Sequence, residues 1–261
     1  METSTYKTHI TAILRQVRDI VLPFYGQVPT WWNKEASAAD VVTELDVRVE
    51  AFLAEELRKA FPSIGFVGEE TGGDRTAECF WLVDPIDGTA HFIRGLPFCT
   101  TMLALIEGRE VVFAAIYAFL TNDLYVAEKN RGALCNDVPI HVSTRPLQQA
   151  YLGWETRLDT VENQQMFTAL AQRCILFSTI NAGFEYAMIA AGKLDGRVCF
   201  NPYGKDYDFA PGALLVAEAG GRVANVGAKT YDYSNVNFIA ANPLVFDALT
   251  NGPEALFPIA Q

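Results

Sequence analysis

The stretch WLVDPIDGTAHF, residues 81–92, joins an apolar run to two aspartates, a proline and a glycine. Side chains three residues apart in a regular strand point to opposite faces, so from such a strand Asp84 and Asp87 could not reach one ion. Pro85 fixes its own φ and lacks a backbone donor, so we expect it to end the strand and bend the chain. The two carboxylates can then converge, with the carbonyl of Ile86 as a third oxygen. The stretch predicts either an acidic turn or a cation site.

The residues after the aspartates favour the cation site. Oxygen ligands of this kind are those that Mg²⁺ prefers, and Mg²⁺ usually keeps water and substrate phosphate in its remaining positions. The backbone amides of Gly88, Thr89 and Ala90 are placed to open a helix that faces a phosphate. Asp-Pro and Asp-Gly alone are common turn signals. The full string DPIDGT is much more specific.

The composition describes a globular chain and disfavours several partners. Half of the 261 residues are hydrophobic, enough for one large domain or two packed lobes. The formal charge is −11 and no basic run occurs, which argues against a nucleic-acid partner. Without a signal peptide or an apolar run of about 18 residues, we expect no membrane partner and a cytoplasmic protein. Five scattered cysteines and three distant histidines predict neither disulfides nor an imidazole metal site.

Apolar periodicity predicts a compact layered α/β chain. The first helix should end near Pro23, and the second should begin near Thr43 and stop before Pro62. The expected domain spans residues 1–261, with an N-terminal lobe 1–143 and a C-terminal lobe 144–261. We expect further helices over residues 160–173, 184–191 and 208–219, strands over 64–67, 80–83 and 237–240, and a meander over 101–128.

Each of three other acidic positions can be explained by a structural role or by a functional one. Glu69 follows a predicted strand and Gly68, where paired glutamates usually form a solvated loop. Asp46 lies three residues after Thr43, so it completes a capping box or serves the site. Asp208 lies near a predicted helix start, where an N-cap is the simple explanation. Together these acids also supply the material for an oxygen-ligand site with several metals.

Taken together, the motifs resemble the inositol monophosphatase family of magnesium-dependent, lithium-sensitive phosphatases. The matching segments occur in the family's order: VTELDVRVE at 42–50, GEE at 68–70, DPIDGT at 84–89 and DFAPGALLVAEAGG at 208–221. The resemblance implies an αβαβα sandwich of the sugar-phosphatase type and a phosphoric monoester hydrolase. It also implies two to three Mg²⁺ ions, a small phosphorylated metabolite as partner, and a homodimer.

The resemblance also implies roles by position. Glu69, Asp84 and the Ile86 carbonyl would hold the first ion. Asp84, Asp87 and Asp208 would hold the second, and a third would lie near Glu69. The expected catalytic residues are Glu69, Thr89 and Asp46, with the Thr89 hydroxyl orienting the attacking water. The expected phosphate and substrate contacts are Gly88, Thr89, Ala90 and Asn201.

The chain departs from the family on the alcohol side of the site. Family members place a substrate-binding Glu in a segment that is about two residues longer here, and Cys199 or Asn201 takes its place. INAG at 180–183 replaces a small Gly-Ser/Thr-Ala segment, and His91 replaces an Asn. Lys34 is a weak phosphate-contact candidate. Few basic residues lie nearby; those noted are Lys193, Arg197 and Lys205.

These departures leave the substrate open. Inositol phosphate, a sugar phosphate, histidinol phosphate and a 3′-phosphonucleotide are the candidates, the last disfavoured by the few basic residues. A non-catalytic, metal-binding or regulatory relative is the alternative of another class. The presence of all expected ligands weighs against that alternative.

Overall fold

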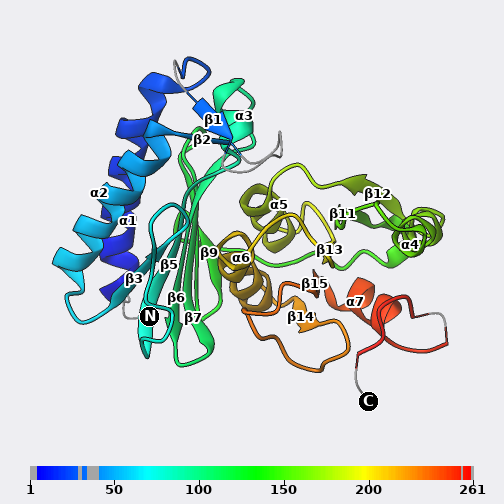
Figure 1. Ribbon diagram of the computed structural model, residues 1–261. Coiled ribbons are helices and arrows are strands. Elements are labelled where there is room, and N and C mark those ends of the chain that lie inside the picture. The colour runs from blue at the N-terminus through cyan, green and yellow to red at the C-terminus, as the bar shows by residue number, and fades with distance from the viewer. Residues whose placement is uncertain (1–4, 29–30, 34–40, 254, 260–261) are drawn as a thin grey trace.

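The computed structural model of the protein describes residues 5–28, 31–33, 41–253 and 255–259; Lys34 lies outside these. Helices and sheets alternate in five layers (Figure 1). A helix pair covers one face of a large sheet, a second pair lies between the large sheet and a small one, and further helices cover the outer face of the small sheet. The predicted αβαβα sandwich is confirmed.

The outer helices on the large sheet are α1 (Thr5–Val21) and α2 (Glu44–Ala60). The apolar residues of α1 recur every three or four positions, so they form one buried stripe. As predicted, α1 ends before Pro23, which lies in the 3₁₀ turn η1 (Leu22–Phe24). Thr43 caps α2 at the predicted position.

The large sheet has the strand order β10-β9-β8-β7-β6-β5-β3-β4. Only its β3–β5 pair is parallel. In β5, Phe80 and Leu82 face the middle helices, whereas Trp81 and Val83 face α1 and α2, as the two-residue period of a strand requires. The bounds are β3 (Gly65–Gly68), β4 (Gly72–Gly73), β5 (Cys79–Asp87), β6 (Thr100–Glu107), β7 (Glu110–Ala118), β8 (Asp123–Glu128), β9 (Ala133–Cys135) and β10 (Val138–Pro139).

The small sheet has the order β12-β11-β13-β15-β14, and β12, β11 and β13 run parallel. The chain segments that follow these three strands therefore leave the same edge. Ligands of open α/β sheets usually bind beside such an edge. The bounds are β11 (Tyr151–Glu155), β12 (Ile175–Ser178), β13 (Gly196–Cys199), β14 (Arg222–Asn225) and β15 (Phe238–Ala241).

The middle helices are α5 (Ala182–Ala190) and α6 (Asp206–Glu218), and the small sheet's outer face carries α4 (Val161–Ala171) and α7 (Pro243–Thr250). Both middle helices are apolar on most sides because sheets cover them on two faces. The remaining elements are β1 (Trp31–Asn33), β2 (Val41–Thr43), α3 (Thr89–Ile93) and η2 (Leu147–Gln149).

Every described strand of the large sheet precedes residue 140, and every one of the small sheet follows residue 150. The proposed lobes, 1–143 and 144–261, stay a prediction. Among the helices that the structure describes, none combines the length and apolar character that crossing a bilayer requires.

Candidate metal and phosphate site

The two aspartates of DPIDGT come together at a β-bulge. Asp84 pairs with Met102 of β6 and Asp87 with Thr100, so three steps along β5 match two along β6. The extra residue reverses which way the following side chains face, and both carboxylates therefore lie on one side. The expectation that Pro85 ends the strand is wrong: β5 continues to Asp87. The proline lies within the bulge, where its missing N–H interrupts no regular ladder.

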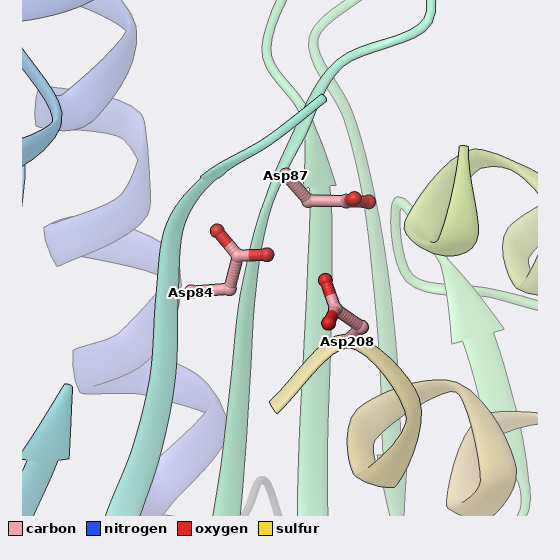
Figure 2. Close-up of side chains that lie close together, drawn as sticks. All are labelled: Asp84, Asp87 and Asp208. Carbon is pink, nitrogen blue, oxygen red and sulfur yellow. The ribbon is translucent and has the colours of Figure 1, made fainter. Parts of the chain in front are cut away.

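Asp208 joins this pair from the first turn of α6. One carboxylate oxygen each from Asp84, Asp87 and Asp208 lies within 4.8 Å of the others. Figure 2 shows the three side chains converging from β5 and from the start of α6. Asp208 also accepts a 2.6 Å hydrogen bond from the backbone amide of Lys205, the N-cap residue of α6. Its capping role therefore holds the carboxylate where it faces β5.

The cluster concentrates negative charge in a buried place. Burial, followed by the charge of neighbouring carboxylates, raises the pKa of Asp84 and of Asp208 well above the ordinary value. Burial also raises the pKa of Asp87 to about 6, although hydrogen bonds oppose this shift. The Asp84 Oδ1 atom is buried and has no hydrogen-bond partner among the described residues. Buried carboxylates that repel one another, with one oxygen of Asp84 left without a donor, fit a hard divalent cation.

Glu69 lies beside the cluster. Its backbone amide donates a 3.0 Å hydrogen bond to the Val83 carbonyl, which attaches the loop after β3 to β5. Its side chain hydrogen-bonds with Asp84, and after burial its charge contributes most to the raised pKa of that carboxyl. The structure thus brings the GEE motif to DPIDGT.

Glu50 holds the loop that carries Glu69, a role that the sequence did not suggest to us. Its carboxylate is 1% exposed and accepts hydrogen bonds from the amides of Glu70 (2.7 Å) and Thr71 (2.8 Å). A Cβ atom on Gly68 would lie 2.3 Å from the Glu50 carboxyl carbon, so this position requires glycine. The spacing in the sequence could have indicated this role, because Glu50 lies four residues after Asp46 and therefore on the same face of the helix.

Asp46 serves both as a cap and as a partner of Thr89. Its Oδ2 atom accepts hydrogen bonds from the Thr43 amide (2.8 Å) and hydroxyl (2.5 Å), which completes the predicted capping box. Its Oδ1 atom lies 2.7 Å from the Thr89 hydroxyl, which also lies 2.9 Å from the Ile86 carbonyl. Burial raises the pKa of Asp46, and hydrogen bonds from the two threonines oppose this.

Gly88 begins α3 with a left-handed φ of +86°. A Cβ atom there would lie 2.5 Å from the Phe98 carbonyl and 2.6 Å from the Asn181 amide nitrogen. The first amides of a helix, here those of Thr89 and Ala90, have no acceptor within the helix. His91 donates its backbone N–H to the Gly88 carbonyl, and its ring packs edge-on against Phe98.

The INAG segment reaches the aspartates directly. The Gly183 amide donates a 2.6 Å hydrogen bond to Asp87 Oδ2, and the Thr100 hydroxyl donates to the same oxygen at 3.0 Å. A Cβ atom on Gly183 would lie 2.1 Å from the Thr100 hydroxyl oxygen. No sequence pattern indicates Thr100, because only the pairing of β5 with β6 brings it to Asp87.

The two candidates for the missing substrate-binding Glu lie elsewhere. Cys199 is fully buried and lies 3.4 Å from the Tyr186 hydroxyl, in the core between the sheets. Asn201 is exposed; its amide donates to Asn237 Oδ1 at 2.7 Å, and its carbonyl accepts from the Arg157 amide. Neither residue is hydrogen-bonded to the aspartate cluster among the described contacts, and the role of Asn201 stays a prediction.

Fold and site together define a layered αβαβα protein with a carboxylate cluster suited to a divalent cation. The sequence model of the inositol monophosphatase family matches residues 4–253, and the chain belongs to this family, whose members depend on a metal.

The chain is 31% identical over 241 residues to a fructose-1,6-bisphosphatase/inositol-1-monophosphatase of Thermotoga maritima, which covers 90% of each chain. It is 33% identical over 229 residues to the Nus factor SuhB of Pseudomonas aeruginosa, which covers 82% of this chain and 83% of that one. A solved structure of an IMPase from Thermotoga maritima matches with a TM-score of 0.84, 28% identity and 94% coverage of both chains.

Proposed function

We propose that the protein is a magnesium-dependent phosphoric monoester hydrolase that acts on a small phosphorylated metabolite. The convergence of Asp84, Asp87 and Asp208 carries this proposal. Membership in the inositol monophosphatase family supports the reaction class.

The proposed ligands form two overlapping sets. Glu69, Asp84 and the Ile86 carbonyl would hold one Mg²⁺, and Asp84, Asp87 and Asp208 a second, with a third near Glu69. When bound, the ions would neutralise phosphate charge, lower the pKa of water and stabilise the leaving oxygen. Because phosphoryl transfer needs little covalent help, the protein mainly positions the groups.

Thr89 and Asp46 are the proposed proton-handling pair. When the Thr89 hydroxyl donates its proton to Asp46 Oδ1, the Oγ1 lone pairs remain available to accept a proton from water. The raised pKa of Asp46 strengthens this carboxylate as an acceptor. The water oxygen bonds to phosphorus and the bond from phosphorus to the ester oxygen breaks. The phosphate keeps one hydrogen of the water, and the proton passed to the Thr89–Asp46 pair balances the proton that the leaving alkoxide takes up.

The phosphate would face the amides of Gly88, Thr89 and Ala90, and Asn201 is the proposed contact on the alcohol side. Inositol phosphate and sugar phosphates are the substrates we favour, because the Thermotoga maritima relative is named for both activities. Histidinol phosphate and a 3′-phosphonucleotide are the alternatives within this class. We also propose that the protein is a cytoplasmic homodimer. Light scattering during size-exclusion chromatography would test the oligomeric state.

A regulatory protein without turnover is the second candidate. Its support is the relative named as a Nus factor, which has a similar length and 33% identity. Such a protein could retain the metal cluster for ligand binding or for stability.

A phosphomonoester panel separates the two candidates. Purified protein is incubated with inositol, sugar, histidinol and nucleoside 3′-phosphates, with Mg²⁺ or with EDTA, and released phosphate is measured. We expect release from at least one small ester that requires Mg²⁺. No release from any member would favour the regulatory protein.

A further inference from the structure

Arg197 is a buried cation between two carboxylates. It lies on β13, is 1% exposed, and pairs through Nη2 with Glu155 Oε2 at 2.8 Å and through Nη1 with Glu185 Oε2 at 3.0 Å. The planar fork of arginine lets one side chain contact both groups. We call Glu155, Arg197 and Glu185 the Arg197 network.

The Glu155 arm of the network leads to Asp208. Glu155 ends β11, and its second oxygen, Oε1, accepts the backbone N–H groups of Tyr203 (3.0 Å) and Gly204 (3.3 Å). The next residue, Lys205, donates its amide to Asp208 Oδ2. Glu155 therefore fixes the segment that leads to the Lys205 amide and so to Asp208.

The Glu185 arm leads to Asp87. Glu185 Oε1 accepts the amide of Ile180 at 2.6 Å and that of Asn181 at 3.3 Å. Arg197 Nη1 also lies 3.4 Å from the Asn181 carbonyl. Two residues further on, the Gly183 amide donates to Asp87 Oδ2. Arg197 thus holds the chain that supplies a hydrogen bond to Asp87.

The surroundings show that the network is closely packed. A Cβ atom on Gly153, in the neighbouring strand β11, would lie 2.5 Å from Glu185 Oε2. The Arg197 guanidinium lies 5.1 Å from the ring centre of Tyr186 and 5.7 Å from that of Phe209. A buried ion pair contributes little net stability compared with apolar side chains of the same size. Its clearest structural consequence here is the fixed placement of two chain segments.

We propose that Arg197 is a positioning residue that sets the Asp87 and Asp208 ends of the metal cluster through the two glutamates. The proposal rests on the proposed function, since it assigns these aspartates to Mg²⁺. The segments 179–181 and 203–204 follow the parallel strands β12 and β13, so the same network also shapes the edge where the alcohol part of the substrate would lie.

The test compares Arg197→Lys with a matched control, Arg222→Lys. Arg222 also pairs with a carboxylate, Asp247, and lies over an aromatic ring, Phe246, but it is on β14 and half exposed. Lysine keeps the charge but has no fork, so at position 197 it cannot hold both glutamates in the same way. Arg197→Met, which leaves two buried carboxylates without a cation, is a harsher variant for comparison.

Mg²⁺ binding is measured by calorimetry, and cooperative unfolding is followed by circular dichroism. We expect Arg197→Lys to weaken Mg²⁺ binding about tenfold while it still unfolds cooperatively, as for other residues that orient metal ligands. Arg222→Lys should change Mg²⁺ binding less than about twofold, since its ion pair with Asp247 is exposed and remote from the aspartate cluster. If Arg197→Met does not fold, Mg²⁺ binding by Arg197→Lys alone tests the proposal. A folded Arg197→Lys protein with Mg²⁺ binding equal to that of the control would overturn the proposal.

The two arms offer an independent readout. Glu185→Gln should mainly weaken Mg²⁺ binding, because its segment contacts Asp87, whereas Glu155→Gln should also raise KM through the 203–204 segment. If Glu185→Gln and Glu155→Gln changed Mg²⁺ binding and KM to the same extent, the two glutamates would not act on separate segments. Calorimetry measures Mg²⁺ binding without turnover. A wild-type protein that binds Mg²⁺ but releases no phosphate would therefore refute the proposed function, while the role of Arg197 could still be tested.

Discussion

The two regions that form the site are held in different ways. On the large-sheet side, a bulge sets Asp84 beside Asp87, and a capping box with Thr43, three residues earlier, holds Asp46. On the small-sheet side, the segments after β12 and β13 are held by the Arg197 network, whose Arg197–Glu155 pair spans 42 residues. The difference teaches that contacts between neighbouring segments place Asp46, Asp84 and Asp87, whereas long-range contacts hold the substrate side and the segment before Asp208.

Asp208→Asn should show the largest effect among the variants that separate the two sides. Asparagine keeps an oxygen for the Lys205 amide, so the start of α6 should survive, but it removes a charge from the cluster. We expect phosphate release to fall about 10³-fold for every substrate, since bound metal is worth several kcal/mol in the transition state. Initial rates on two substrates measure this, with the exposed Asp247→Asn as control. A change in substrate preference without a large loss of rate would undermine the comparison.

Thr89→Val should come next. Valine keeps the branched shape but removes the hydroxyl that bonds Asp46. We expect kcat to fall about 100-fold, as for a lost acid–base group, while Mg²⁺ binding by calorimetry changes less than about twofold, because every proposed carboxylate ligand keeps its place and the Ile86 carbonyl keeps its oxygen. The exposed Thr121→Val is the control. Loss of Mg²⁺ binding would show that Thr89 supports the cluster instead of the water.

Removal of metal should produce a moderate dependence of stability on pH. In the folded protein the pKa of Asp87 is raised from 3.8 to about 6, so the native state binds more protons than the unfolded state between these values. The free energy of unfolding in EDTA should therefore fall as pH rises through about 6. Urea unfolding at pH 5 and pH 8 measures it, and Mg²⁺ should stabilise more at pH 8. A metal-free protein that becomes more stable over this range would contradict the buried charge cluster.

Arg157→Ala should show the smallest effect and belongs to the substrate side. Arg157 is exposed, lies over the Tyr203 ring at 5.0 Å, and contacts the Asn201 segment. Such exposed pairs are worth about 0.5–1 kcal/mol, so KM should change about two- to fivefold and differ between substrates. The ratio of kcat/KM for two esters measures this. An equal loss of kcat for both would place Arg157 with the reaction groups.

Local periodicity predicts the first helix and the meander, whereas only the resemblance to the family predicts that the acidic motifs meet, because the contacts that join them are long-range. The sequence misplaces the end of β5, since the bulge depends on how Asp84 and Asp87 pair with Met102 and Thr100 of another strand. It also misses Glu50, whose partners lie about 20 residues away.

Arg197 shows the same limit more clearly. In the sequence it is one of three basic residues near the altered segment, whereas in the structure it is fully enclosed by carboxylates and aromatic rings. Because arginine is usually exposed, only the tertiary fold identifies this one as part of the core. The short strands β11, β12 and β13 escape prediction for a related reason, since their pairing with distant segments defines them.

The most direct test of the central claim is phosphate release by Asp87→Asn beside the wild type, at saturating Mg²⁺ and on the best substrate of the panel. An aspartate that only accepts hydrogen bonds from Gly183 and Thr100 could be replaced by asparagine, whereas a ligand of a magnesium cluster could not. We predict that Mg²⁺-dependent release is abolished while circular dichroism and cooperative unfolding are retained. Undiminished turnover by the folded variant would contradict the metal assignment.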